Sequence, residues 1–145
     1  FILFEDVGGG LLVKKMAGYH QYHAVNVAVQ ETVRACLPPE TSSKVREGEG
    51  AYFAKAQKDA KPGDRRVGVV WHTQGSGKSL TMVFLVRKMR SVPELRKFKT
   101  VIVTDRKDLQ RQLSETAGLI GETVKVGKSI RDVKKLLATS EPEQR

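Results

Sequence analysis

The stretch Trp71-His72-Thr73-Gln74-Gly75-Ser76-Gly77-Lys78-Ser79 decides the fold class of this 145-residue chain. It follows a β-branched run, Val67 to Val70, and precedes an apolar segment, Leu80 to Val86. A buried strand, a glycine-rich turn and a helix in this order predict a loop that binds a nucleoside triphosphate. The sequence therefore predicts an α/β chain of the P-loop NTPase class.

The residue types of this loop suit the chemistry of phosphate binding. Gly75 and Gly77 let the backbone curl so that its N–H groups point at phosphate oxygens, and the N-terminus of the next helix adds partial positive charge. Lys78 is expected to reach the β and γ oxygens, and the Ser79 hydroxyl to ligate Mg²⁺. The usual pattern begins with Gly five residues before its Gly-Lys pair, where this chain has His72. A glycine-rich turn that binds nothing is the alternative, and the order of the residue types argues against it.

Composition limits the classes of partner and location. The net charge of +10 and the pI near 9.9 favour a polyanion, with nucleic acid the leading candidate. The densest basic run, residues 87–99, is by itself better explained as a solvated helix end. One cysteine, Cys36, excludes a disulfide framework and predicts a reducing, cytoplasmic location. No apolar run is long enough to span a bilayer, so no membrane partner is expected.

The first half of the chain predicts three segments. Residues 1–17 are expected to form an N-terminal hairpin, edge ribbon or linker, with Gly8-Gly9-Gly10 at the turn. Residues 18–37 predict a helix, although partly alternating valines leave a strand as the alternative. Residues 38–65 are polar and aperiodic, and they are expected to form a surface excursion with a short helix over 51–60.

In the second half of the chain, patterns typical of buried strands alternate with patterns typical of helices. Buried strands are predicted at 67–71, 100–104 and 123–126, and helices follow each of them. This alternation specifies a parallel sheet with right-handed crossovers. The first of the helices is expected over residues 79–90.

Capping residues predict where the other two helices begin. Asp105 and Asp108 are expected to cap one helix, and Ser129 with Asp132 forms a capping box for the other. The apolar residues expected to face inward are, in the first helix, Leu109, Leu113 and Ala117, and in the second, Ile130, Val133, Leu136 and Leu137.

Three segments carry a resemblance to a known family: Gly18 to Val25, the phosphate loop, and Val101 to Leu113. Their order and spacing resemble the first RecA-like motor domain of superfamily 2 helicases and translocases. Within that superfamily, the chain is most similar to the restriction (R) subunit of type I restriction–modification enzymes. The similarity lies in the sequence His-Thr-Gln-Gly-Ser-Gly-Lys-Ser and in Thr-Asp-Arg-Lys-Asp-Leu downstream of it. That family also shows a histidine where this chain has His72. The resemblance implies that residues 18–145 are a partial RecA-like ATP-binding motor domain, an incomplete parallel sheet flanked by helices.

The resemblance also implies roles for individual residues. Gln21 matches the glutamine that recognises the adenine edge, and Tyr19 or Tyr22 would stack on the ring. Lys78 and Ser79 carry the catalytic positions, Ser79 as the magnesium ligand. The residues implied to bind ATP are Gln21, Thr73, Gln74, Gly75, Ser76, Gly77, Lys78 and Ser79. Thr104 and Arg106 match a segment that contacts the DNA backbone, while helix capping is an equally good explanation for Thr104.

The implied function is ATP hydrolysis coupled to duplex DNA translocation in the complete subunit of a bacterial or archaeal restriction system. Modification (methylase) and specificity subunits would be its partners. To hydrolyse ATP, such a motor also needs an Asp-Glu pair on a later strand and an arginine finger. The sequence contains no buried strand with this acidic pair. The nuclease carboxylates of the family lie upstream of its motor domain, and they are absent from this chain too. The chain therefore resembles the front part of a motor domain from a larger polypeptide, and hydrolysis by it alone is expected to be slow or undetectable.

Two other functions stay open from the sequence. A small P-loop phosphotransferase would need an acceptor site and an arginine-rich lid, and neither is found. A non-catalytic nucleotide- or DNA-binding module would use the same loop without turnover.

Overall fold

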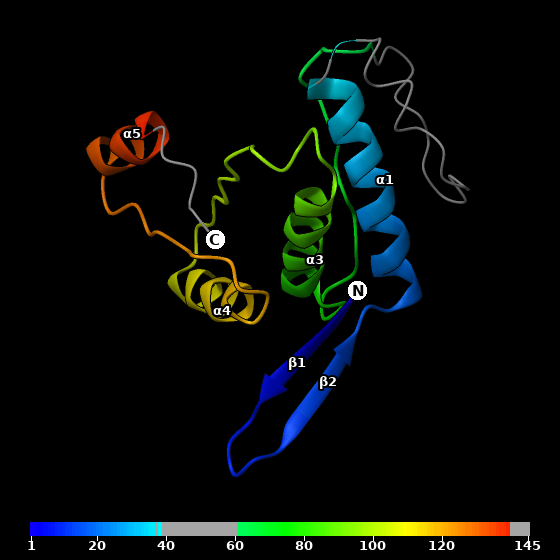
Figure 1. Ribbon diagram of the computed structural model, residues 1–145, viewed down its shortest axis with the longest axis vertical. Coiled ribbons are helices and arrows are strands. Elements are labelled where there is room, and N and C mark those ends of the chain that lie inside the picture. The colour runs from blue at the N-terminus through cyan, green and yellow to red at the C-terminus, as the bar shows by residue number, and fades with distance from the viewer. Residues whose placement is uncertain (37, 39–60, 140–145) are drawn as a thin grey trace.

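The computed structural model describes residues 1–36, 38 and 61–139. Its elements are, in chain order, β1 (Ile2–Asp6), β2 (Leu12–Met16), α1 (Tyr19–Cys36), α3 (Lys78–Ser91), α4 (Lys107–Gly118) and α5 (Ile130–Ala138). Helices α1 and α3 pack side by side, α4 packs against α3, and the hairpin of β1 and β2 projects away from them (Figure 1). None of the helices in these residues is long and apolar enough to cross a membrane.

An antiparallel hairpin forms at the N-terminus, as the sequence predicts. Ile2 pairs with Met16 at one end of the ladder and Asp6 with Leu12 at the other. The turn between the strands contains Gly8-Gly9-Gly10, all three with positive φ, a conformation that glycine adopts at little cost.

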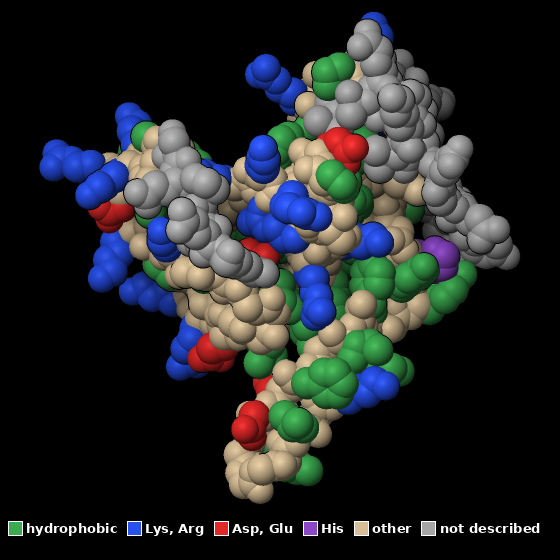
Figure 2. Space-filling view, viewed as in Figure 1, with side chains coloured by type: hydrophobic (Ala, Val, Ile, Leu, Met, Phe, Trp, Pro, Cys, Tyr) green, Lys and Arg blue, Asp and Glu red, His purple; other side chains and the backbone are tan. Residues whose placement is uncertain are grey.

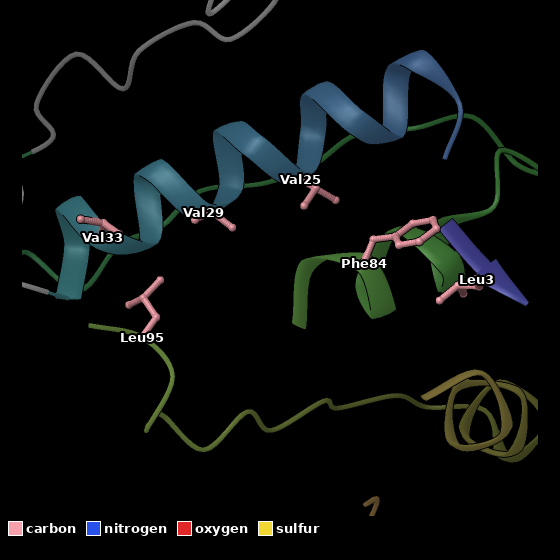
Figure 3. Close-up of a cluster of buried hydrophobic side chains, with 6 residues drawn as sticks. All are labelled: Leu3, Val25, Val29, Val33, Phe84 and Leu95. Carbon is pink, nitrogen blue, oxygen red and sulfur yellow. The ribbon is translucent and has the colours of Figure 1, made fainter. Parts of the chain in front are cut away.

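The core lies between α1, α3 and β1. Val25, Val29 and Val33 are buried and lie one turn apart along α1, which settles the ambiguity of this segment in favour of a helix (Figure 3). Their partners in the cluster are Phe84 of α3, Leu3 of β1 and Leu95. Cys36, which has the same helical spacing, is exposed instead.

The predicted parallel sheet is absent from the described residues. The two-stranded pair of β1 and β2 is the one sheet there, and the segments at 67–71, 100–104 and 123–126 are not hydrogen-bonded into any ladder. A buried parallel strand needs hydrogen-bonded neighbours and helices over both faces. Without them the side chains of Val69, Trp71 and Val103 are 91%, 88% and 89% exposed.

Helix α4 begins differently from the prediction. Its N-cap residue is Arg106, no side chain makes a capping hydrogen bond, and the expected pairing of Asp105 with Asp108 is wrong. The Thr104 hydroxyl instead accepts the Arg106 N–H at 3.3 Å, so a residue one position earlier shapes the turn into the helix. The predicted inward face is correct, because Leu113 is buried and the two other residues of that face are partly buried.

Helix α5 has its predicted cap but not its predicted burial. The Ser129 hydroxyl accepts the Asp132 N–H at 3.1 Å. No residue of α5 is buried, and the exposed apolar side chains include Ile130, Val133 and Leu137. Lys99 Nζ holds the end of the helix, because it donates to the carbonyls of Leu136 and Leu137 and to that of Thr139, the C-cap residue. The expected inward face is therefore wrong, because no sheet formed by the described residues lies beneath it.

Most of the predicted surface excursion, including the helix expected over 51–60, lies outside the described residues. Where the description resumes, the chain is tied to the end of α1. Gly63 N–H donates to Arg34 O and Arg65 N–H donates to Ala35 O, both at 2.8 Å. The Arg34 side chain is buried and donates to the Asp64 carboxylate at 3.0 Å and to the Arg66 carbonyl. One arginine of α1 therefore fixes the point at which the chain returns to the core.

Candidate nucleotide-binding site

The glycine-rich loop runs directly into α3, which begins at Lys78. Gly75 and Gly77 have φ values of 80° and 74°, in the left-handed region that side chains disfavour. Gly77 is the N-cap residue of α3, and no side chain caps the helix. Since the first N–H groups of a helix have no partner within it, this end of α3 is suited to an anion.

Lys78 lies folded back over its own loop. Its Nζ donates to the carbonyl oxygens of His72 at 3.1 Å and Thr73 at 2.7 Å. The side chain is exposed, so the ammonium is held at the mouth of the loop and not in the core. A phosphate would compete for the same three protons of this ammonium group.

The structure brings Gln21 to the loop from α1, 56 residues away in sequence from Gly77. The side chain is only 5% exposed, so it is not an ordinary surface glutamine. Its Oε1 accepts the Gly18 N–H at 2.8 Å, and its Nε2 donates to Gly77 O at 3.1 Å and more weakly to Ser76 O at 3.4 Å. Both ends of the amide thus have protein partners, and contact with adenine stays a prediction.

The two tyrosines proposed for stacking on adenine are both exposed. Tyr19 lies against the ring of His23 at a centroid distance of 4.2 Å, and Tyr22 lies against Phe1 at 4.9 Å. Tyr19 is the more exposed of the two. Their stacking role is untested by this geometry.

His72 occupies the position where the usual loop pattern has its first glycine. Its ring packs edge-on against His20 at 5.0 Å, and its Nδ1 is buried with no hydrogen-bond partner in the described part of the chain. Burial, and then the nearby charges of His20 and Lys78, lower the pKa of His72, so it is neutral at physiological pH.

The other predicted ATP-binding residues lie along the same loop and first turn. Thr73 and Gln74 are exposed on the approach, and Ser79 is partly buried in the first turn of α3. Ser76 Oγ is buried and makes no hydrogen bond to any described residue. The loop therefore gathers the predicted set, including the proposed magnesium ligand, in one place.

Thr104 and Arg106 are not joined to this loop by any hydrogen bond between described residues. The Thr104 hydroxyl is engaged in the turn before α4, and Arg106 is exposed. Thr104 therefore bonds within this turn and does not cap α4, and DNA contact by either residue stays a prediction.

Basic side chains are widespread on the face shown in Figure 2. In the run 87–99, however, several cations bind the protein itself. Arg87 donates to Ile2 O, Arg90 to Phe98 O and to the Glu122 carboxylate, and Lys99 to the last turn of α5. These three side chains link separate segments of the fold, so the explanation of the run as a solvated helix end is incomplete.

Sequence reasoning missed one residue of the site. The Nε2 atom of His20 lies 3.2 Å from Ser76 O, on the loop. The available signal was its position beside Gln21, since two neighbours at the start of a helix can both reach a loop that lies over that end.

A glycine-rich loop that runs into a helix beginning with Lys78 and Ser79 is the arrangement typical of a P-loop NTPase-like protein. The chain belongs to the SWI2/SNF2 ATPase family, which matches residues 20–144. The match covers α1 from its second residue, the loop, and helices α3, α4 and α5.

Two relatives narrow the comparison further. The chain is 41% identical over 145 aligned residues to the HindI type I restriction enzyme endonuclease subunit of Haemophilus influenzae. It is 32% identical over 124 residues to the putative MjaIXP type I restriction enzyme endonuclease subunit of Methanocaldococcus jannaschii. These alignments cover 97% and 86% of this chain, and they confirm the resemblance to R subunits.

The chain spans 12% and 10% of the lengths of these two relatives. No solved structure matches it.

Proposed function

We propose that this chain is the ATP- and Mg²⁺-binding part of the ATP-dependent DNA translocase of a type I restriction endonuclease. In the complete subunit, ATP hydrolysis would be coupled to translocation along duplex DNA. One observation carries the proposal. Gly77 caps α3 without a side chain, so the first N–H groups of that helix face the loop next to Lys78.

The residues of the loop fit a triphosphate. Lys78 would exchange the carbonyls of His72 and Thr73 for β and γ oxygens, which form stronger, charge-assisted hydrogen bonds. Ser79 would hold Mg²⁺, which supplies charge neutralisation between the phosphates. A Cβ on Gly77 would lie 2.8 Å from Gln21 Nε2 and would push the end of that side chain away from the loop.

The partners in this proposal follow from charge and from the relatives. The net charge of +10 suits duplex DNA, and Thr104 and Arg106 are the candidate contacts to its phosphates. Both relatives bear the names of endonuclease subunits of type I restriction enzymes. We therefore propose methylase and specificity subunits as partners, in the cytoplasm.

The test is binding of Mg²⁺–ATP to the protein and to its Lys78→Ala variant, measured by calorimetry. Lys107→Ala is the matched control, because Lys107 also begins a helix but has no glycine-rich loop before it. Loss of charge-assisted bonds to the phosphates is expected to weaken binding at least about tenfold in Lys78→Ala and to leave the control unchanged. Equal affinity in all three proteins would show that this loop is not the triphosphate site.

A further inference from the structure

The first turn of α1 reaches the phosphate loop through two neighbouring side chains. His20 Nε2 lies 3.2 Å from Ser76 O, and Gln21 Nε2 lies 3.4 Å from the same oxygen. The principal bond of Gln21 is the shorter one, to Gly77 O at 3.1 Å. Of the two side chains, His20 is therefore the closer partner of the Ser76 carbonyl.

The direction of that carbonyl fixes the direction of an N–H group. Every peptide bond in the described residues is trans, and in a trans peptide the C=O and N–H point to opposite sides. The Ser76 carbonyl is directed toward α1, so the N–H of Gly77 is directed away from α1. An N–H that projects from this loop is one of the donors with which such a loop surrounds phosphate oxygens.

The helix itself does not fix this peptide unit. The next carbonyl, Gly77 O, already accepts the Thr81 N–H at 3.0 Å as the first hydrogen bond of α3. Among the described residues, the side chains of His20 and Gln21 are the partners that hold Ser76 O. The His20 ring is in turn held in place by its edge-on contact with His72.

We propose that His20 is a positioning residue for the phosphate-binding loop: its Nε2–H donates to the Ser76 carbonyl and thereby aims the Gly77 N–H at the triphosphate. This role rests on the proposed function, because it assumes that the loop binds the phosphates of a nucleotide. His20 itself does not touch the ligand. Its effect is therefore on the phosphate moiety and not on the base.

Three variants separate the donor from the ring. His20→Phe keeps an aromatic ring against His72 but has no donor. His20→Gln keeps a donor, now an amide. His23→Phe is the matched control, because His23 is one turn further along α1 and contacts Tyr19 and Tyr22 instead of the loop. Thermal unfolding by circular dichroism checks that each variant is folded.

The measurements are affinities for Mg²⁺–ATP, tripolyphosphate and adenosine, together with the amide NMR resonance of Gly77 in the free protein. We expect His20→Phe to bind ATP and tripolyphosphate about threefold to tenfold more weakly, the loss typical of one hydrogen bond, and to bind adenosine as before. His20→Gln should recover most of this affinity, and His23→Phe should match the wild type. The Gly77 resonance should move in His20→Phe and return toward its original position in His20→Gln.

The proposed function and the positioning role of His20 would be contradicted by different results. If the wild-type chain bound neither ATP nor tripolyphosphate, the proposed function would fail. If the wild type bound both, but His20→Phe bound them equally well with an unmoved Gly77 resonance, the positioning role would be overturned alone. Equal weakening by His20→Phe and His20→Gln would also overturn it, since ring packing would then explain the loss.

Discussion

Two features of the structure favour glycine at position 77: the backbone conformation there and the close approach of the Gln21 side chain. Its φ of 74° is disfavoured for any residue with a Cβ, and a Cβ there would lie 2.8 Å from Gln21 Nε2. Gly75 has a similar φ of 80°, but a Cβ there would meet nothing within 4 Å. A substitution at Gly75 therefore introduces backbone strain alone, whereas a substitution at Gly77 introduces both backbone strain and a clash with Gln21 of α1.

Gly77→Ala is expected to abolish measurable ATP binding and to lower the free energy of unfolding by about 2 kcal/mol, from strain and displacement of Gln21 together. Gly75→Ala should show only the strain, about 1 kcal/mol, and a smaller loss of affinity. Urea unfolding and calorimetry measure the two quantities. Identical effects of the two substitutions would mean that the contact with Gln21 does not matter.

Asp64 predicts an acid dependence of stability. Hydrogen bonding from the Arg66 backbone N–H, and then from Arg34, lowers the pKa of this carboxyl from 3.8 to about 2. The folded chain thus binds a proton at Asp64 less readily than the unfolded chain does. Its stabilising contribution is complete above about pH 4 and is lost as the pH falls toward about 2.

We therefore expect Asp64→Asn to be less stable than the wild type near neutral pH and the difference to shrink across this acidic range. Thermal unfolding followed at several pH values measures it. Glu115→Gln, at an exposed site away from the start of α4, is the control for the loss of one negative charge. A constant difference between Asp64→Asn and the wild type at all pH values would contradict the linkage.

For individual residues, the sequence predicts which side chains lie together when those residues are close along the chain. The loop glycines, Lys78 and Ser79 lie together because they are neighbours in the sequence. Approach of Gln21 to the loop was expected from the family resemblance. The contact of His20 with Ser76 and the burial of Arg34 were not expected, because each depends on how distant segments meet in space.

Among the elements, α1 and α3 form the part of the molecule with a true core. Phe84 is 1% exposed and packs within the cluster that includes Val25 and Val29, whereas Met82 on the same helix is 36% exposed. Figure 3 shows Val25, Val29 and Val33 on the side of α1 that faces Phe84 and Leu95.

Phe84→Ala is expected to lower the free energy of unfolding by about 3–5 kcal/mol, because it leaves a cavity in this cluster. Met82→Ala should cost less than half of that. Chemical denaturation measures both, and equal costs would show that α1 and α3 do not share a core.

Helices and strands differ in how well the sequence predicts them, for a physical reason. A helix closes its hydrogen bonds within its own segment, so the periodicity of α1 and the Ser129 cap of α5 were sufficient. A parallel strand needs partners that a local pattern does not supply. The runs at 67–71 and 100–104 have the composition of strands, yet no described residue pairs with them.

On the scale of the whole molecule, the runs at 67–71 and 100–104 carry the most exposed apolar side chains among the residues that the structure describes. Val69 and Val103 are 91% and 89% exposed, and each lies in a run of high β-propensity. Such segments pair readily with other strands, whether in a longer polypeptide or in a second copy of the chain.

The isolated chain is therefore expected to self-associate as its concentration rises. Val69→Lys with Val103→Lys should shift it toward the monomer, because lysine opposes edge-to-edge pairing. Light scattering coupled to size-exclusion chromatography measures the mass. Thr116→Lys on α4, away from these runs, is the control, and an equal shift in that variant would point to net charge alone.

The tie between Arg34 and the Lys61–Arg66 turn has a consequence for how this molecule can vary. The chain leaves the end of α1 and is returned to the same turn of backbone at Gly63, so the two ends of the intervening segment are clamped independently of its sequence. The entropy of closing such a segment grows only logarithmically, by about 0.6 kcal/mol for each doubling of its length. Insertions and deletions between Cys36 and Lys61 should therefore leave the phosphate loop intact, which makes this the natural place for length variation among relatives and for a fused reporter.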